Sequence, residues 1–340
     1  MSFDVGARQV ALEDTILGHP RYKEALRQLE ASATRARNVG LAGRARIMIG
    51  GAGDGKTRLL RKLAGQPWAQ PTTGSTGDQV PMRYIEVPSR VNPRELVKTI
   101  LESFGERAGT RQSAEDILDD LVPLFEGVGL RLLMLDEAHW LMKSKSKEVR
   151  EANAEFIKSL INRTGVSLIL AGMEELDLLH DAFHAQMRRR LLHKVVLRPY
   201  RWASAAERKW FIAILHKYEE AMDLPGRSDL GGEDMARRLY LVSRGSLGVV
   251  VQYLSNALEL VAARGGDRVT AADLSSAHWG IVPSAPFDLA GDMDKFEKDV
   301  VDVAGDPFLS KGDDFAKLWA AAFGKEDDSR ATKLAPGPRP

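Results

Sequence analysis

Residues 44–64 read RARIMIGGAGDGKTRLLRKLA, and this stretch decides the fold. A short apolar run, Ala45–Ile49, leads into a glycine-rich turn, and leucines at helical spacing follow the turn. The turn, Gly50–Thr57, fits the phosphate-loop pattern G-x-x-x-x-G-K-[ST] at every position. Glycines let successive backbone N–H groups curl around phosphate oxygens, and the next helix points its positive end at the anion. The stretch therefore predicts a strand, a phosphate-binding loop and a helix.

The polar residues of this loop have expected roles. Lys56 is expected to reach the β- and γ-phosphates of ATP, and the Thr57 hydroxyl to bind Mg²⁺. A glycine turn with an incidental lysine is the alternative, and the predicted strand before it and helix after it disfavour that interpretation. The expected nucleotide-binding residues are Gly50, Gly51, Ala52, Gly53, Asp54, Gly55, Lys56, Thr57, Arg58 and Asp136.

An acidic pair ends the most apolar stretch of the chain. Residues 130–137 read LRLLMLDE, and such a continuous apolar run is typical of a central parallel strand that is buried on both faces. Ligands bind at the carboxyl edge of such sheets. We expect Asp136 to hold Mg²⁺ there, and Glu137 to act as the general base that polarises the attacking water. A strand that merely ends in charged residues is the alternative.

Strands alternate with helices as far as residue 202. Further strands are predicted at 82–87, 166–172 and 194–200, and helices at 19–37, from Pro93, from the capping box Ser113–Asp116, and at 147–162. Residues 67–78 are expected to form a loop because they are rich in proline and glycine. The segment before residue 19 is expected to be extended. This alternation predicts an α/β domain built on a parallel sheet.

Helices alone are predicted after residue 202, near 204–222, 233–243, 247–264 and 271–279. The expected domains are therefore an N-terminal lead-in and helix (1–43), an α/β nucleotide-binding domain (44–202), a small helical lid (203–280) and an acidic C-terminal extension (281–340). In the extension, residues 314–324 predict one amphipathic helix, and the end of the chain has a disordered composition. The extension, with its Asp306-Pro307-Phe308 stretch, is either a partner-docking tail or a solvated appendage.

Three consecutive arginines precede the last predicted strand, in QMRRRLL at residues 186–192. One of Arg188, Arg189 and Arg190 could reach the γ-phosphate of a neighbouring subunit as an arginine finger. A solvated basic helix end explains the same residues equally well.

Basic residues also gather near the expected carboxyl edge of the sheet. They lie in KSKSKEVR, directly after the acidic pair, and in VPSRVNPREL. Side chains there could contact the phosphate backbone of DNA, although a charge run is usually a solvated face. The candidates are Arg90, Arg94, Lys143, Lys145 and Lys147.

Composition sets further limits. The chain has 340 residues, 48 Lys+Arg against 47 Asp+Glu, and no cysteine, which excludes disulfides, a catalytic thiol and cysteine-ligated metal sites. A net charge of +1 means that any nucleic-acid surface must be a local patch. The sequence shows no signal-peptide pattern and no apolar run long enough to span a membrane, so we expect a cytoplasmic protein.

The order of these parts resembles the AAA+ ATPases, and more narrowly the TniB/TnsC regulators of DNA transposition, which are also similar to MuB. The segments that carry the closer resemblance are LGHPRYKEALRQLE, VPMRYIEVPSRVNPRELVKTILESFG, LLMLDEAHWLM, QMRRRL with VVLRPYRW, and SRGSLGVVVQYLSNALELV. The resemblance covers roughly residues 14–280. It implies a P-loop AAA+ three-layer α/β domain with a parallel sheet, followed by an all-helical lid.

Residue by residue, the resemblance implies ATP and Mg²⁺ as cofactors and places the arginine finger at Arg190. It implies ATP-driven assembly of a homo-oligomeric ring or helical filament on double-stranded DNA, which recruits a transposase and a TniQ-type target selector and which ATP hydrolysis disassembles. Slow hydrolysis is expected because two positions, Met173 and Arg244, depart from the family pattern. Met173 stands where a polar sensor is usual, and Arg244 does not clearly match the second sensor arginine.

Two other functions fit the same motifs. One is a different AAA+ role, such as a helicase loader or a secretion ATPase of the ExeA type. The other is a nucleotide-bound scaffold that does not hydrolyse ATP. Glu137 argues against the scaffold, and Met173 leaves it open.

Overall fold

The computed structural model describes residues 4–38, 40–74, 77–89, 91–187, 189–281 and 305–323. The chain divides into two compact units: a core unit of residues 20–198, and a lid unit that combines residues 1–19 with residues 199–340. The units therefore separate at 19/20 and 198/199, whereas the sequence suggested boundaries at 43/44 and 202/203. Arg90 and Arg188 lie outside the described residues.

A five-stranded parallel sheet forms the middle of the core unit. Its strand order is β4 (Met82–Glu86), β5 (Leu132–Asp136), β6 (Ser167–Gly172), β1 (Ala45–Ile49) and β7 (Val195–Val196). Every residue of β1, β5 and β6 is buried. This confirms the central-strand interpretation of the apolar runs, because both faces of the sheet are covered.

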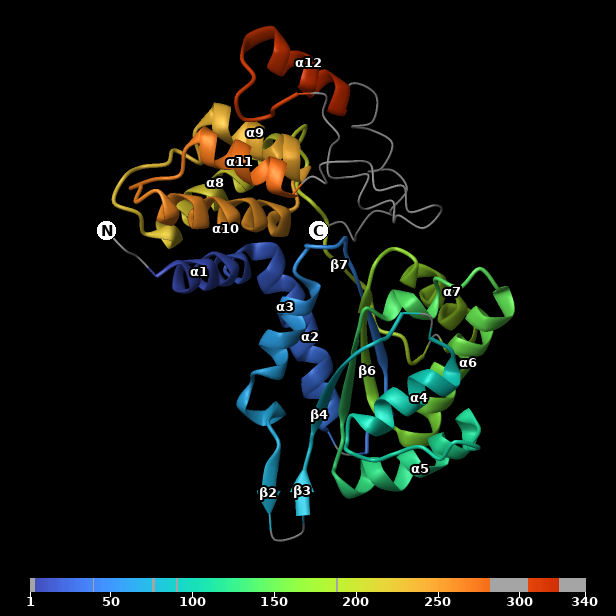
Figure 1. Cartoon of the computed structure of the whole chain (residues 1–340). Helices are drawn as coiled ribbons and strands as arrows, with labels where there is room; N and C mark the ends of the chain where they lie inside the picture. The colour runs from blue at the N-terminus through green and yellow to red at the C-terminus, as the bar shows by residue number, and fades with distance from the viewer. Residues whose placement is uncertain are drawn as a thin grey trace. The chain divides into compact units, whose positions relative to one another are not determined.

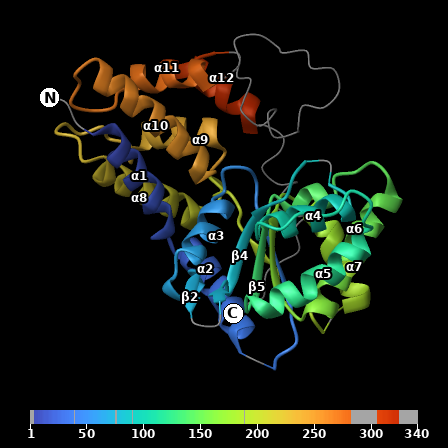
Figure 2. The same ribbon diagram turned by 60° about the horizontal axis from the view of Figure 1, so that its bottom comes forward.

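Helices cover the two faces of the sheet and complete three layers (Figures 1 and 2). One face carries α2 (Pro20–Arg37) and α3 (Lys56–Ala64). The other carries α4 (Pro93–Glu102), α5 (Ala114–Gly127), α6 (Lys147–Thr164) and α7 (Leu176–Met187). An apolar core of this unit lies between the sheet and α4–α7, and includes Leu133, Leu135, Ile157 and Leu170.

Local capping starts these helices where the sequence indicated. Asn92 accepts from the Glu95 N–H at the start of α4, and Ser113 and Asp116 form the expected capping box of α5. Ser146 caps α6 by accepting from the Val149 N–H, and Gly165 ends it in the left-handed conformation. The strands after the phosphate loop are thus separated by helices with clear sequence boundaries.

Three expectations about local structure were wrong. Residues 67–78 hold a short 3-10 turn, η1 (Pro67–Ala69), and part of an antiparallel hairpin, β2 (Thr72–Gly74) with β3 (Gly77–Gln79). The last strand is only Val195–Val196, because its pairing with β1 stops there. The chain before residue 19 is not extended but forms α1 (Val5–Leu17).

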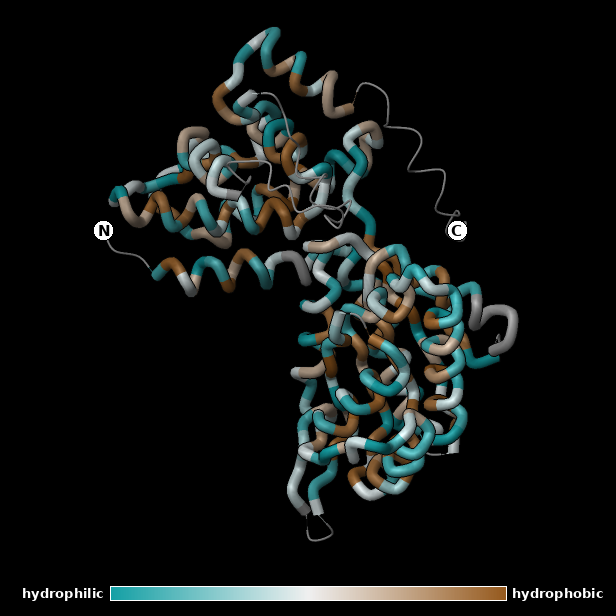
Figure 3. Tube along the Cα trace, turned by 45° about the vertical axis from the view of Figure 1, so that its right-hand side comes forward, coloured by the Kyte–Doolittle hydropathy of each residue, from teal (hydrophilic) through white to brown (hydrophobic). Residues whose placement is uncertain are grey.

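The regular elements in the described part of the lid unit are all helices. It contains α1, α8 (Ala205–Met222), α9 (Glu233–Ser243), α10 (Leu247–Ala263), α11 (Ala271–Ile281) and α12 (Gly312–Phe323). α1 packs on α8 and α10, with Leu12 fully buried and the Gln9 amide donating to the Ser255 carbonyl at 3.3 Å. Figure 3 shows hydrophobic and hydrophilic residues alternating along α1. This buried contact explains why the first helix forms despite its weak sequence pattern.

No single helix in the described part of the chain has the length and apolar composition needed to cross a membrane. One pair of helices, α9 and α10, has that length and composition when taken together, but the two are bent by 111°.

Candidate nucleotide-binding site

The phosphate loop leaves β1 and enters α3 as the sequence indicated. Gly53 and Gly55 have φ angles of 72° and 81°, in the left-handed region that favours glycine. The backbone N–H of Gly51 donates to the Asp54 carboxylate at 2.7 Å, which holds the loop curled on itself. A Cβ atom on Gly55 would lie 2.7 Å from the Tyr22 ring, so no other residue fits there without displacing Tyr22.

Lys56 lies within the loop, with 5% of its surface exposed. Its ammonium donates to the carbonyls of Gly50 at 2.9 Å and Gly51 at 2.7 Å. Burial lowers the pKa of Lys56, and the nearby carboxylates of Glu137, Asp54 and Asp136 oppose that shift. The structure therefore places one cation at the mouth of the loop, held by carbonyl contacts that a phosphate could replace.

Asp136 is the centre of a hydrogen-bond cluster at the end of β5. It is 1% exposed, and its Oδ2 accepts from the Thr57 hydroxyl at 2.6 Å and the Tyr84 hydroxyl at 2.9 Å. Burial, followed by the charge of Asp136, raises the pKa of the Tyr84 hydroxyl, which keeps it a donor. The structure thus joins Thr57 and Asp136, which the sequence assigned to magnesium from positions 79 residues apart.

Glu137 follows in a constrained backbone position. Its φ of 52° lies in the left-handed region, and its N–H donates to the other Asp136 oxygen at 2.9 Å. The Glu137 carboxylate lies 3.2 Å from Nδ1 of His139, a side chain that is 1% exposed. Burial raises the pKa of Glu137, while the Lys56 ammonium lowers it. A half-buried carboxylate with a raised pKa beside a phosphate loop has the properties of a general base.

Two tyrosines complete the site, and the sequence did not point to either. The Tyr22 hydroxyl donates to the Asp54 carbonyl at 2.9 Å, so α2 supports the loop. Tyr84 reaches Asp136 because strands β4 and β5 pair in parallel, with Tyr84 opposite Met134. Alternation along the predicted strand at 82–87 would place Tyr84 and Glu86 on one face, but the register with β5 is known only from the structure.

The residues around Asp136 fit a magnesium ion. Mg²⁺ at nucleotide sites takes one or two protein ligands, several waters and phosphate oxygens. The Thr57 hydroxyl and the Asp136 carboxylate, 2.6 Å apart at the end of the phosphate loop, supply this kind of donor set. In the described part of the chain no group of three or more His, Asp or Glu side chains is placed to hold a metal, so a metal held by protein ligands alone is not indicated there.

Arg190 lies at the other end of β1 from the phosphate loop. Its carbonyl accepts from the Ala45 N–H at 2.9 Å, and its guanidinium is within 3.5 Å of the Ile161 carbonyl. The length of a five-residue strand, roughly 15 Å, separates that end from Gly50. Arg189 is exposed. This placement leaves Arg190 too far to serve its own loop directly, so the finger role remains a prediction about a neighbouring subunit.

The two departures from the family pattern lie in different units. Met173 directly follows β6, where the Gly172 carbonyl accepts from the Gly50 N–H at 3.1 Å. A thioether there offers no strong hydrogen bond to a water or a phosphate. Arg244 ends α9 in the lid unit, with a left-handed φ of 47°.

The candidate DNA contacts differ in how much of each side chain is already engaged. Arg94 donates to the carbonyls of Gln112, Gly109 and Thr110, at 3.0, 3.3 and 3.1 Å, and so holds a loop of its own chain. Lys143 lies over the Trp140 ring at 4.5 Å. Lys145 is exposed between η2 (Ala138–Leu141) and α6. Lys147 is exposed at the first position of α6 and pairs with Glu151 at 3.5 Å. The two exposed lysines are therefore the better placed for a polymer contact.

These features define the class of the protein. A sheet of order β4-β5-β6-β1-β7, a phosphate loop after β1, an acidic pair after β5 and an all-helical second unit are the AAA+ fold. The sequence model of the family described as "Bacterial TniB protein" matches residues 8–201, more than half of the chain. The chain therefore belongs to the TniB family.

Solved structures with the same fold include three archaeal proteins. Cdc6p from Pyrobaculum aerophilum has a TM-score of 0.56 and 19% identity, over 77% of this chain and 67% of that one. The Aeropyrum pernix ORC1 protein in complex with DNA has a TM-score of 0.55 and 22% identity, over 79% and 69%. The Aeropyrum pernix ORC2 protein, in ADPNP–ADP complexes, gives 0.50 and 21%, over 76% and 67%. Such identities establish the fold alone. No curated protein matches the sequence.

Proposed function

We propose that this protein is an ATP-dependent DNA-binding regulator of DNA transposition. The observation that carries the proposal is the Thr57–Asp136 contact beside Lys56 and Glu137, because it unites the parts that ATP hydrolysis requires. Membership of the TniB family supports transposition as the process that this ATPase serves.

Each residue of the site has a proposed role in the reaction. The loop N–H groups and the Lys56 ammonium bind the phosphates, and Lys56 exchanges its contacts with Gly50 and Gly51 for phosphate oxygens. Thr57 and Asp136 hold Mg²⁺, which when bound neutralises charge on the β- and γ-phosphates. Glu137 accepts a proton from the attacking water. Arg190 of one subunit stabilises the charge on the phosphate bound by the next.

DNA binding and assembly form the second half of the proposal. ATP binding drives oligomerisation into a ring or helical filament on double-stranded DNA, and the assembly recruits a transposase and a TniQ-type target selector. The exposed Lys145 and Lys147 contact DNA phosphates, so binding is salt-sensitive and largely independent of sequence. The solved ORC1 structure of the same fold contains DNA, which supports DNA as the polymer.

A nucleotide-bound scaffold without turnover is the second candidate. Met173 favours it, because the end of β6 beside the phosphate loop carries no polar side chain there. The two candidates share nucleotide binding. They differ in hydrolysis, and in DNA binding, because the scaffold acts through protein contacts only.

Mixing two inactive variants separates the candidates and tests the finger. Arg190→Ala keeps an intact phosphate loop, and Lys56→Ala keeps an intact Arg190, so neither variant alone should hydrolyse ATP on DNA. A mixture should recover turnover if Arg190 acts on a neighbouring subunit, because some interfaces then combine both intact parts. Arg189→Ala, at the exposed neighbouring arginine, is the matched control and should retain turnover.

Hydrolysis itself is tested by Glu137→Gln, which should slow ATP turnover on DNA by roughly 100-fold or more while nucleotide binding persists. Glu126→Gln, at an exposed glutamate of α5, should change neither. If the unmodified protein binds ATP but its turnover with DNA equals that of Glu137→Gln, the hydrolysing regulator is wrong and the scaffold is favoured.

A further inference from the structure

Residues 305–323, here called the tail segment, pack against the lid unit of their own chain. The lid residues that receive them, here called the tail groove, are Trp202, Arg238, Tyr240, Leu241, Tyr253 and His278. The sequence left open whether this region docks or is a solvated appendage. The structure shows a defined docking contact for the tail segment.

The first part of the contact is a turn at Asp306-Pro307-Phe308. The Asp306 carboxylate accepts from the N–H groups of Phe308 at 2.8 Å and Leu309 at 3.0 Å, and also from the Ser275 hydroxyl of α11. The Phe308 ring is 2% exposed and lies 5.8 Å from the ring of Tyr253. The turn therefore inserts one aromatic side chain into the lid.

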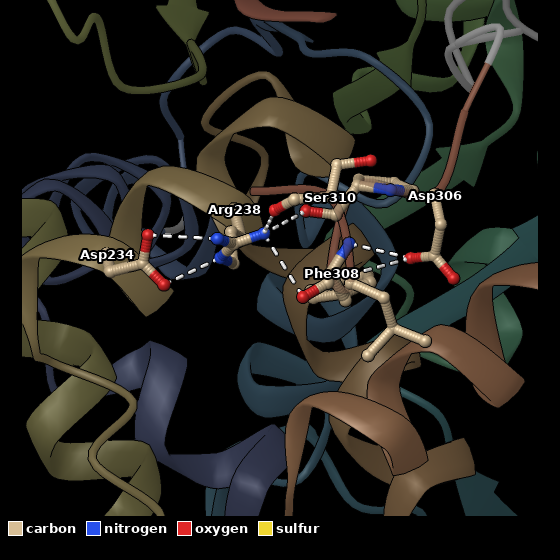
Figure 4. A network of polar contacts seen from close by, with 7 residues as sticks. Asp234, Arg238, Asp306, Phe308 and Ser310 are labelled. Atoms are coloured by element: carbon tan, nitrogen blue, oxygen red, sulfur yellow. Dashed lines mark hydrogen bonds and ion pairs between the residues drawn. The ribbon is translucent and has the colours of Figure 1, made fainter. Parts of the chain in front are cut away.

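Arg238 of α9 holds the same turn from the other side. One guanidinium nitrogen donates to the carbonyls of Pro307, Phe308 and Ser310, at 2.9, 3.1 and 2.9 Å. Asp234 fixes the guanidinium through contacts of 2.7 and 3.1 Å, as Figure 4 shows. One buried arginine thus donates to three backbone carbonyls that only this turn conformation brings together, so this part of the contact resembles peptide recognition.

The second part is the aromatic face of α12. Phe315, Trp319 and Phe323 recur every four residues and so lie on one side of the helix. Trp319 lies 5.7 Å from the ring of Trp202, Phe323 lies 5.5 Å from Tyr240, and Leu318 packs with Leu241. The opposite side carries exposed Asp314 and Lys317. An amphipathic helix lying in an aromatic groove is a common protein-docking arrangement.

We propose that the tail groove also binds the tail segment of a second copy of this chain, so that tails are exchanged between subunits. Groove and segment are present in every copy, and the contacts made by Arg238 and the aromatic face are the same whether the segment comes from the same chain or from another. Exchange of identical elements is a low-cost route to association, because only the connection changes.

The connection is long enough for exchange. Residues 282–304 link α11 to the tail segment, and a chain of that length can span at most roughly 80 Å. The docked part is also small: a single turn and a helix of 12 residues, which is marginal in water without a partner surface. The proposal goes beyond the proposed function, although assembly on DNA would bring copies close enough to favour exchange.

Thiol cross-linking tests the proposal directly, because the chain contains no cysteine. Trp279 on the lid and Leu309 on the tail segment are 53% and 52% exposed, and both contact Asp306. A chain with both Trp279→Cys and Leu309→Cys should close on itself with a short bis-maleimide, which shows that the positions are within reach. A mixture of the two single variants, one carrying a mass tag, should give a mixed two-chain product.

The expected result is a mixed product about tenfold above the two-chain background of either variant alone, at high protein concentration and with ATP analogue and DNA. Phe315→Ala in the Leu309→Cys chain should remove that product, and Lys317→Ala, on the exposed side of α12, should retain it. Exchange is overturned if the double variant cross-links within one chain but the mixture of single variants gives no two-chain product. It is also overturned if the mixed two-chain product still forms with Phe315→Ala. Light scattering on the same samples measures assembly on DNA separately. If no assembly is seen, that result contradicts the proposed function and not the exchange.

Discussion

The phosphate-binding edge of the core unit and the tail groove of the lid unit differ in how the sequence builds them. Eight consecutive residues, Gly50–Thr57, form most of the first site, and Asp136 and Glu137 complete it. The tail groove and the tail segment together join residues from 202 to 323, and their contacts are mostly aromatic rings and one buried arginine. The first site depends on backbone shape and charge and the second on packing, so mutations should separate the two.

Lys56→Ala should have the largest effect on nucleotide binding, a loss of roughly 100-fold in ATP affinity. The variant removes the cation that contacts the Gly50 and Gly51 carbonyls of the phosphate loop, and charge-assisted hydrogen bonds of this kind contribute up to about 3 kcal/mol. Titration with a fluorescent ATP analogue measures it. Lys62→Ala, at an exposed lysine of the same helix, should bind normally. Equal losses in both variants would mean that general charge, and not the loop contact, sets affinity.

Phe308→Ala should act on the lid and leave the nucleotide site unchanged. Truncating a ring that is 2% exposed should cost about 3 kcal/mol of docking free energy and release the tail segment. Limited proteolysis of residues 305–323 reports the release. Leu309→Ala, at a side chain that is 52% exposed, should stay within about 0.5 kcal/mol. A matching fall in ATP affinity would show that the two sites are not separable.

Tyr84→Phe should give a smaller change, confined to the magnesium dependence of nucleotide binding. It removes one donor to the Asp136 oxygen, worth about 1 kcal/mol, so the Mg²⁺ concentration needed for half-maximal binding should rise several-fold. Nucleotide binding without Mg²⁺ should not change. Tyr22→Phe, which loses its bond to the Asp54 carbonyl, should weaken binding equally with and without Mg²⁺. If Tyr84→Phe also does so, Tyr84 supports the loop and not the metal site.

Acidification should give the smallest effect, a loss of stability in the lid. Burial lowers the pKa of His278 below its ordinary 6.5, although the Asp306 carboxylate opposes this shift. The ring forms a hydrogen bond with the Tyr253 hydroxyl and packs against the rings of Trp279 and Phe308. In acid the unfolded lid therefore binds more protons than the folded lid. The stability that neutral His278 contributes is fully present above pH 6.5 and is lost as the pH falls from there through the lowered pKa. Thermal unfolding between pH 8 and 5 should show this decline, and His278→Gln should reduce it. If the loss of thermal stability between pH 8 and 5 is the same in the variant, other groups cause it.

Sequence reasoning predicted the core unit well where the information is local. The apolar runs at β1, β5 and β6, the capping box that starts at Ser113, and the phosphate-loop pattern each depend on neighbouring residues. The site contact between Thr57 and Asp136 followed because parallel strands bring their carboxyl ends to one edge of the sheet. The AAA+ fold and the family were therefore predictable from motifs.

Features fixed by distant contacts were missed. α1 forms because Leu12 is buried against a lid that begins almost 190 residues later, and its own pattern is weak. Tyr84 reaches Asp136 only through the register of β4 with β5. The hairpin β2–β3 has strands of three residues, too short for alternation to emerge from a region rich in proline and glycine. Docking of the tail segment depends on surfaces that no single stretch of sequence reveals.

The most direct test of the proposed function is electron-microscopic imaging of the protein with duplex DNA, in the presence of an ATP analogue, ADP or no nucleotide. We expect rings or filaments on DNA with the ATP analogue only, and their loss with Lys56→Ala. No DNA-bound assembly in any nucleotide state, or equal assembly in all three, would contradict the proposed function.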